Sequence, residues 1–241
     1  MSFSTRASAL VAIMMGGAYL SAAGDALAEA PDDPLLTMVI VDELEYRDAD
    51  DGDLLAWNAQ VWIGKDLRKL WIKTEGERSG GSTEDAELQF LYSKSIARYW
   101  DFQVGVRQDF KPSPNRTWAA IGFQGLAPYF FEIDTALFIG DSGRTALRME
   151  AEYELLFTQR LILTPNIEVN IYGKKDPEIG LGSGLSDLEV GLRLRYEIRR
   201  EFAPYIGVNW SKLFGGTADF ADAAGQESSD FQLVIGLRAW F

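Results

Sequence analysis

Cysteine and histidine are both absent from this chain of 241 residues. Without cysteine the chain forms no disulfide and offers no thiolate as nucleophile or metal ligand. Without histidine it lacks the residue on which Ser- and Asp-dependent hydrolases mostly rely as general base. A pair of carboxylates can hydrolyse glycosides, but no pair stands out in the sequence. We therefore expect a protein that is not an enzyme.

Long apolar runs are also lacking after the first 28 residues. A membrane-spanning helix needs about 20 consecutive apolar residues, and the mean hydropathy of the chain is only −0.09. Basic residues are outnumbered, with 23 Lys and Arg against 36 Asp and Glu and a formal net charge of −13. This balance excludes nucleic acid as a partner, because binding phosphates requires a basic patch. It favours loops or a lumen that attract cations.

The first residues have the pattern of an export signal. Arg6 is the only charge before Asp25, Ala7–Leu20 is a run of apolar and small residues, and Ala26–Ala28 fits a cleavage site. These features predict a secretory signal peptide over residues 1–28. A short periplasmic leader at residues 29–37 and an outer-membrane β-barrel at residues 38–241 then complete the predicted organisation.

Alternation of apolar and polar residues is the main signal in the rest of the chain. In Phe231–Phe241 the apolar side chains fall mostly on one face of a strand, and in Thr145–Phe157 they alternate with charged ones. Most such segments run about 9–11 residues, the length that a tilted strand needs to cross a bilayer. The twelve predicted strands are Met38–Tyr46, Leu54–Gly64, Lys69–Glu77, Ala86–Ser95, Trp100–Phe110, Thr117–Gly125, Tyr129–Ile139, Thr145–Phe157, Leu161–Tyr172, Asp187–Ile198, Ala203–Leu213 and Phe231–Phe241.

Short and long connections are expected to alternate between these strands. Arg78–Asp85, Gly173–Ser186 and Phe214–Asp230 are predicted as long loops, whereas Leu126–Pro128 is tight. Barrels of the bacterial outer membrane have short periplasmic turns and longer outer loops. The sequence therefore predicts an all-β fold: a transmembrane, antiparallel, up-and-down β-barrel of the outer-membrane type, with about 12 strands and both termini in the periplasm.

The inner face of this barrel, read by parity, is crowded with charge. One interpretation is a set of ion pairs that fills the interior, since buried charges are kept only when paired. The other is a carboxylate-rich path for a cation, in a lumen whose twelve strands allow a narrow or gated pore. The lumen charges are Glu75, Glu87, Arg107, Asp109, Glu132, Asp134, Arg148, Glu150, Glu152, Glu154, Glu168, Glu189, Arg193, Arg195, Glu197 and Arg238.

Long strings of residues carry a family resemblance. Thr117–Tyr129 reads TWAAIGFQGLAPY and continues FFEIDTALFIGDSGRTALRMEAEYELLFTQRLIL; with it go Lys69–Glu77, Tyr172–Val208 and the closing Arg238–Phe241. Together they resemble the copper-resistance protein B family of Gram-negative outer membranes, over nearly the whole chain from about Pro34. The resemblance implies a role in copper tolerance, with copper ions and outer-membrane lipid as partners. It also implies a periplasmic multicopper oxidase as partner, with copper either sequestered or moved across the membrane.

The chain departs from that family in its metal ligands. Members often carry a Met- and His-rich segment ahead of the barrel, which this sequence does not show; after the signal only Met38 and Met149 remain. Sulfur ligands suit Cu(I), whereas carboxylates suit Cu(II), so we expect no tight copper site and a weak or transient handling of Cu(II). The candidate metal ligands are Met38, Asp42, Glu43, Glu45, Glu75, Glu150, Glu152 and Glu154.

Two points about these candidates stay open. Met38 is either a thioether ligand or a plain strand residue. Glu150, Glu152 and Glu154 share one face of a strand about 6.5–7 Å apart, which suits stepwise transfer between sites rather than one shared ion. The alternative function is a structural or general small-solute barrel whose acidic lumen has no metal role.

Overall fold

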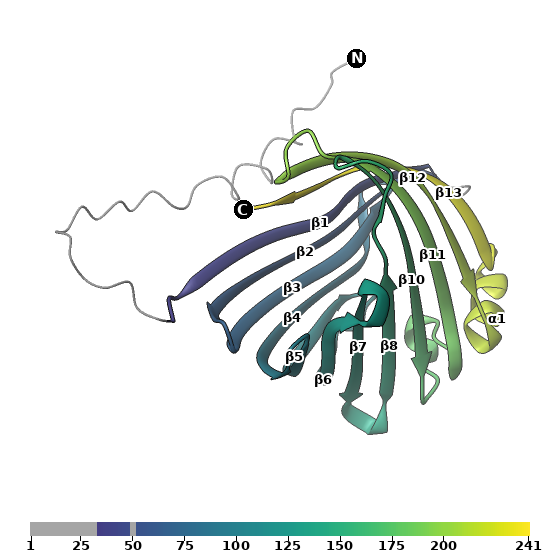
Figure 1. Cartoon of the computed structure of the whole chain (residues 1–241). Coiled ribbons are helices and arrows are strands. Elements are labelled where there is room, and N and C mark those ends of the chain that lie inside the picture. The colour runs from purple at the N-terminus through teal and green to yellow at the C-terminus, as the bar shows by residue number, and fades with distance from the viewer. Residues whose placement is uncertain (1–32, 49–51) are drawn as a thin grey trace, which may run out of the picture. The chain divides into compact units, whose positions relative to one another are not determined.

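Antiparallel pairing runs from strand to strand around the molecule and returns to its start (Figure 1). The computed structural model describes residues 33–48 and 52–241, so the predicted signal peptide at residues 1–28 lies outside the described residues. The strands are β1 (Leu36–Asp48), β2 (Leu54–Lys65), β3 (Arg68–Ser79), β4 (Ser82–Ala97), β5 (Trp100–Lys111), β6 (Arg116–Ala127), β7 (Phe131–Gly140), β8 (Thr145–Glu152), β9 (Leu155–Leu156), β10 (Leu161–Tyr172), β11 (Gly184–Tyr196), β12 (Phe202–Leu213) and β13 (Ser229–Trp240).

The sheet closes because its first and last strands pair. Ile40 of β1 lies opposite Trp240 of β13, and this pairing continues to Asp48 opposite Leu233. The two-residue strand β9 prolongs the line of β8 along β10, so the chain crosses the sheet twelve times. The prediction of an antiparallel barrel of about twelve strands is confirmed.

The predicted eighth strand, Thr145–Phe157, is wrong as a single strand. β7 begins at Phe131, and its last pairing with β8 joins Glu132 to Glu152. Beyond that point the chain has no β7 neighbour and pairs only with β10, where Leu155 lies opposite Leu163.

The predicted long loop Arg78–Asp85 is also wrong. β3 and β4 continue through it to Ser79 and Ser82 and are joined by Gly80 and Gly81 alone. Both glycines have positive φ, 57° and 90°. Two-residue hairpin turns with this backbone conformation match the twist of the strands and favour glycine. The Gly/Ser-rich composition marked a tight turn rather than a loop.

The last connection holds a helix that the sequence analysis did not predict. Helix α1 spans Gly215–Ala224 and ends at Gly225, whose φ is 77°. It packs against β11, where the Thr217 hydroxyl lies 2.9 Å from that of Ser186 and accepts a hydrogen bond from the Gly182 amide. None of the helices in the described part of the chain has the length and apolar character that spanning a membrane requires.

We name the two ends of the barrel by their connections. The turn end carries the connections near residues 66–67, 98–99, 128–130, 157–160 and 197–201. The loop end carries the connection between Asp48 and Leu54 and those near residues 80–81, 112–115, 141–144, 173–183 and 214–228. β1 begins and β13 ends at the turn end (Figure 1).

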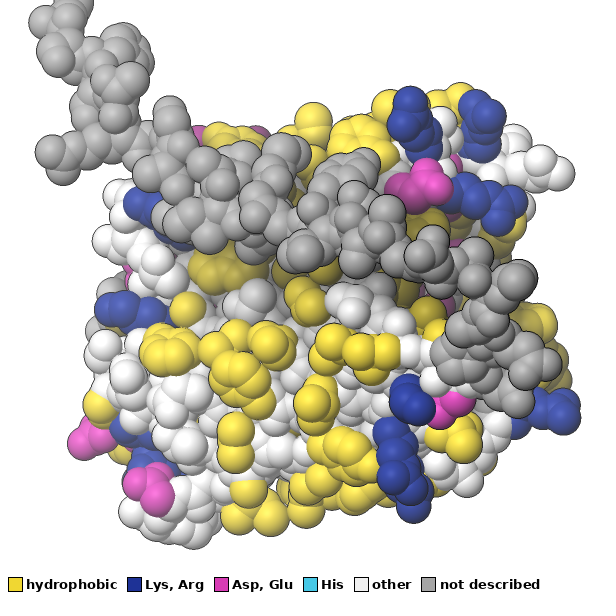
Figure 2. All heavy atoms as spheres, turned by 90° about the vertical axis from the view of Figure 1, so that its left-hand side faces the viewer, with side chains coloured by type: hydrophobic (Ala, Val, Ile, Leu, Met, Phe, Trp, Pro, Cys, Tyr) yellow, Lys and Arg dark blue, Asp and Glu magenta, His cyan; other side chains and the backbone are white. Residues whose placement is uncertain are grey.

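The outer face is apolar, as the alternation requires. In β13, Phe231, Leu233 and Ile235 are more than half exposed, whereas Gln232 between them is buried. Apolar side chains spread over the face shown in Figure 2, with charged ones mostly towards its margins. Met149 points outwards too, with 38% of its surface exposed.

Apolar side chains also form one row on the inner face. Trp62 of β2 lies opposite Trp71 of β3, and the row continues in register through Leu91, Gly105, Ala120, Phe138 and Ala146 to Tyr172 of β10. Its centre, Phe138, is 1% exposed. A packed row of this kind fills one wall of the lumen and leaves the polar side chains to the remaining space.

We predict that Phe138→Ala lowers the free energy of unfolding by about 3 kcal/mol, because it empties a packed interior position. Phe90→Ala, on the outer face where 47% of the ring is exposed, serves as the control and should cost less. Urea unfolding of the lipid-refolded barrel, followed by tryptophan fluorescence, measures both. Equal losses in the two variants would contradict the assignment of Phe138 to a packed inner row.

Candidate functional site

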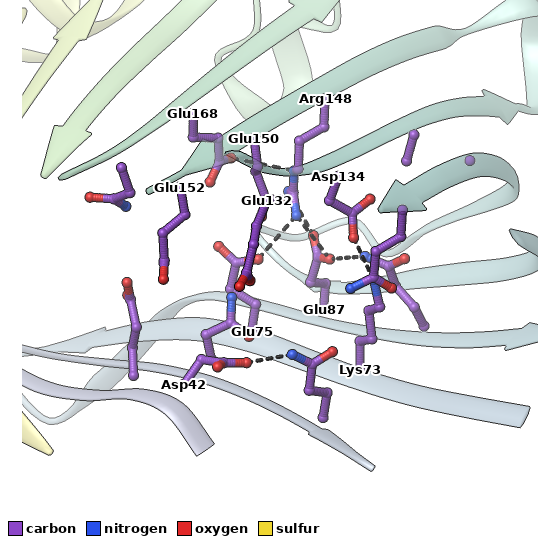
Figure 3. Close-up of a pocket in the computed structure, with 18 of the residues that line it drawn as sticks. Asp42, Lys73, Glu75, Glu87, Glu132, Asp134, Arg148, Glu150, Glu152 and Glu168 are labelled. Atoms are coloured by element: carbon purple, nitrogen blue, oxygen red, sulfur yellow. Dashed lines mark hydrogen bonds and ion pairs between the residues drawn. The ribbon is translucent and has the colours of Figure 1, made fainter. Parts of the chain in front are cut away.

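The lumen holds a cavity of about 440 Å³. Eleven acidic side chains line it, against four basic ones (Figure 3). The acidic residues are Asp42, Glu43, Glu75, Glu77, Glu87, Glu132, Asp134, Glu150, Glu152, Glu168 and Glu189, and the basic residues are Arg47, Lys73, Arg148 and Arg238. A low-dielectric wall lined by one sign of charge raises the local concentration of the opposite ion.

Four of these carboxylates form a row across neighbouring strands. Asp134 of β7 lies opposite Glu150 of β8, Glu150 opposite Glu168 of β10, and Glu168 opposite Glu189 of β11. Residues paired in this way have Cβ atoms about 4.5–5.5 Å apart, and like charges there destabilise the sheet. We call this set the acidic row. It brings carboxylates closer together than the predicted ladder along a single strand does.

Cations balance three members of the acidic row. The Lys73 ammonium lies 2.6 Å from Asp134, Arg148 lies 3.3 Å from Glu168, and Arg47 lies 3.2 Å from Glu189. Glu150 differs: among the described residues no ion pair or hydrogen bond reaches its carboxylate. The same holds, within that part of the chain, for Glu132, whose neighbour across the strands is Glu152.

Glu45, predicted as a metal ligand, is fully enclosed at 0% exposure. Its Oε1 accepts hydrogen bonds from Arg193 and from the Tyr205 hydroxyl at 2.9 Å, and its Oε2 accepts one from Arg47 Nε at 2.8 Å. Arg193 also contacts Glu43 at 2.9 Å. These donors use the lone pairs that a metal would need, so the structure leaves Glu45 no free ligand atom.

Glu87 has a similar place on the other side of the lumen. It lies between Arg107 at 2.7 Å and Arg148 at 3.0 Å, and is 4% exposed. Arg107 stacks over the Phe138 ring at 4.6 Å and pairs with Asp109 at 2.6 Å. Two Arg–Glu–Arg groups therefore stand inside the barrel, one around Glu45 and one around Glu87.

The remaining predicted residues lie at several heights of the lumen. Asp42 pairs with Arg238 at 3.3 Å, and Arg238 also reaches Glu154 at 3.3 Å. Arg195 contacts Glu154 at 2.5 Å. Met38 lies in register with Trp62, towards the turn end. Within the part of the chain that the structure describes, no three Asp or Glu side chains are placed to hold one metal ion.

Two basic lumen residues were missed by the sequence analysis as site residues. The predicted first strand ends at Tyr46, but β1 extends to Asp48 and carries Arg47 into the lumen with 4% exposure. Lys73 lies within the predicted strand Lys69–Glu77 but is not among the predicted lumen charges. Extending the alternation by one residue beyond Tyr46 would have placed Arg47 on the inner face. The partner of Lys73 could not be found in this way, because it lies on a strand far away in the sequence.

At the loop end, Asp176 ties three connections together. Its carboxylate accepts hydrogen bonds from Arg116 at 2.9 and 3.1 Å and from Arg144 at 2.7 Å. Asp176 stands between β10 and β11, whereas Arg116 begins β6 and Arg144 precedes β8. The bonds from Arg116, reinforced by Arg144, hold the pKa of Asp176 below its usual range against the effect of burial. We call these three residues the latch.

Similarity to known proteins identifies the family. Residues 35–241 match the family described as "Copper resistance protein B precursor (CopB)". Copper resistance protein B of Escherichia coli is 50% identical over 204 residues, which are 85% of this chain and 69% of that protein. A copper resistance protein B homolog of Pseudomonas syringae pv. tomato (strain ATCC BAA-871 / DC3000) is 49% identical over 210 residues, 87% of this chain and 71% of that protein. This chain belongs to the copper resistance protein B family.

A solved structure supports the fold. The NanC porin covers 85% of this chain and 99% of its own length, with a TM-score of 0.54 at 12% sequence identity. At that identity the likeness concerns the barrel alone. Together with membership of the copper resistance protein B family, it assigns this barrel to the outer membrane.

We predict that Asp176→Asn loosens the loop of residues 173–183, because a neutral amide loses the charge-assisted bonds to Arg116 and Arg144. Trypsin should cut after Lys174 and Lys175 faster in the variant. A lowered pKa in the folded barrel means that the latch stabilises the loop above the usual Asp pKa of about 3.9, and that this stabilisation is lost as the pH falls through the lowered value. Wild-type protection should therefore be the same at neutral and mildly acidic pH.

The control is Asp219→Asn in α1, an exposed aspartate of the loop end. It should leave cleavage after Lys174 and Lys175 unchanged. If both variants were cut at the wild-type rate, the latch would have no part in ordering this loop.

Proposed function

We propose that this barrel contributes to copper tolerance at the outer membrane by passing or holding Cu(II) in its acidic lumen. The observation that carries the proposal is the excess of eleven carboxylates over four basic side chains around the 440 Å³ cavity. Such a wall attracts cations and repels anions. The names of the relatives suggest copper as the metal, and the acidic lumen suggests that the ion is a cation. The role is non-enzymatic.

The donor set favours loose binding. Carboxylate oxygens suit Cu(II), whereas Cu(I) prefers sulfur ligands, and the chain has no cysteine or histidine. No described group of three carboxylates is placed around one ion. Glu132 and Glu150, which make no ion pair or hydrogen bond among the described residues, are the best available ligands. A hydrated ion that exchanges between them and the acidic row fits this geometry.

The proposed orientation puts the turn end in the periplasm and the loop end outside. Short connections on one side and longer ones on the other support it, since outer-membrane barrels are inserted in that sense. On this proposal both termini are periplasmic. A periplasmic multicopper oxidase would then exchange copper with the turn end, where Glu132 and Glu152 lie near the start of β7 and the end of β8.

We predict that Glu132→Gln with Glu150→Gln weakens the copper response of the barrel. In a planar bilayer the wild type should carry a cation-selective current that micromolar to millimolar Cu(II) blocks, because the ion is held at these carboxylates. The double variant should show a several-fold weaker block. Glu201→Gln with Glu227→Gln, outside the strands, removes the same charge and should behave as wild type.

Metal tolerance of whole cells distinguishes a copper-specific role from that of a general small-solute barrel. Loss of the protein should lower tolerance to copper but not to zinc or cadmium, and the Glu132/Glu150 variant should fail to restore it. A barrel that conducts but leaves copper tolerance unchanged would contradict the copper role and favour a general small-solute barrel.

Labelling of single introduced cysteines tests the proposed orientation. Because the chain has no cysteine of its own, each label reports on one position alone. Ser142→Cys and Gly225→Cys at the loop end should react with a large polyethylene-glycol maleimide on intact cells, because that reagent does not cross the outer membrane. Asp66→Cys and Tyr99→Cys at the turn end should react only after lysis. The reverse labelling pattern would contradict this orientation and place the turn end outside the cell.

A further inference from the structure

Arg148 joins opposite walls of the barrel. It stands on β8, and two of its partners, Glu75 and Glu87, stand on β3 and β4. In the strand order, β8 lies five strand spacings from β3 through β4, β5, β6 and β7, and seven through β10, β11, β12, β13, β1 and β2. Side chains that meet over this separation cross the lumen.

The guanidinium of Arg148 is fully used. Its Nη1 lies 3.0 Å from Glu75, its Nη2 lies 3.0 Å from Glu87, and its Nε lies 3.3 Å from both Glu168 and Asn170. Only 11% of the side chain is exposed, and its end stacks 6.0 Å from the Phe138 ring. Figure 3 shows these bonds converging on Arg148 in the middle of the pocket.

Two other basic side chains of the described residues also reach across the lumen, but over four strand spacings rather than five. Lys73 on β3 meets Asp134 on β7, four spacings away. Arg238 on β13 meets Glu154, which follows β8, also four spacings away. Of Arg148, Lys73 and Arg238, only Arg148 pairs with carboxylates on three other strands. It therefore makes the largest set of ion pairs across the lumen among these three residues.

We propose that Arg148 is a crossbar that narrows the lumen and determines which ions pass. Without Arg148, Glu75 and Glu168 would have no ion pair among the described residues, and Glu87 would keep only Arg107. A planar guanidinium that forks between carboxylates is held more firmly than a lysine would be. A small cation advances past this level by taking the place of the guanidinium at Glu75 or Glu168, and an anion meets carboxylates on every side. The inference deepens the proposed cation path and rests on it.

The test is ion conductance of the refolded barrel in a potassium chloride gradient, without copper. Arg148→Gln removes the crossbar and one positive charge. We expect its single-channel conductance to rise at least about two-fold, with the reversal potential displaced towards the potassium equilibrium value. Arg200→Gln, in the exposed turn before β12, loses the same charge outside the lumen and should match the wild type.

A second variant distinguishes the effect of lumen width from the effect of charge, and it leaves fewer carboxylates without a cation than the single variant does. Arg148→Gln with Glu75→Gln keeps the net charge of the lumen, since one base and one acid are neutralised together. Its conductance should rise as in the single variant, whereas its reversal potential should stay near that of the wild type. Heat-dependent mobility on gels checks that each barrel is folded.

The outcomes are separable from the copper question. A silent wild type with conducting variants supports the crossbar, because removing Arg148 then opens the lumen. Variants that conduct like the wild type, or that stay silent with it, overturn the crossbar. Since the gradient contains no copper, these results leave the copper-tolerance test to decide the proposed function by itself.

Discussion

The hydrocarbon of a membrane offers no partner to a backbone N–H or C=O group, and this constraint determines the rest of the structure. A β-sheet meets it by closing on itself, which pairs every backbone group between neighbouring strands. Here the pairing of β1 with β13 removes the last free edge. Closure then assigns every second side chain to the interior. The charged residues that alternate along each strand face the interior, because the outer face contacts hydrocarbon. The constraint that closes the barrel therefore also concentrates charge inside it.

That concentration explains why the lumen has two kinds of carboxylate. Burying an ionised group without a partner is costly, and breaking a buried pair costs more than the pair contributes. Glu45 and Glu87 avoid the cost by lying between two arginines each. Among the described carboxylates around the cavity, Glu132 and Glu150 have no ion pair. On the proposed function, these two are where an external cation gains most by entering.

Sequence alone could predict which face each residue of a strand occupies, but not which residues meet. The alternation in Thr145–Phe157 placed Glu150 and Glu152 inside and Met149 outside. The acidic row depends instead on the register of β7, β8, β10 and β11, and a shift of one residue would dissolve it. The partners of Arg148 and Lys73 could not be predicted for the same reason, since they lie on strands that are far apart in the sequence. Helix α1 was hidden for another reason: its small and acidic residues resemble those of a solvated loop, and its contact with β11 through Thr217 is tertiary.

An oxygen-lined lumen separates ions by charge more than by identity. Glutamates that hold a hydrated Cu(II) ion without displacing much of its water distinguish it little from other divalent cations, because the preference of copper for nitrogen and sulfur is never used. On the proposed function, the choice of copper must therefore be made elsewhere, by a periplasmic protein that delivers or accepts the metal at the turn end. In the same proposal, the barrel contributes a path whose resistance depends on arginines that compete with the passing ion. Such a path would conduct only when the local cation concentration is high enough to displace a guanidinium, which is the condition under which tolerance is needed.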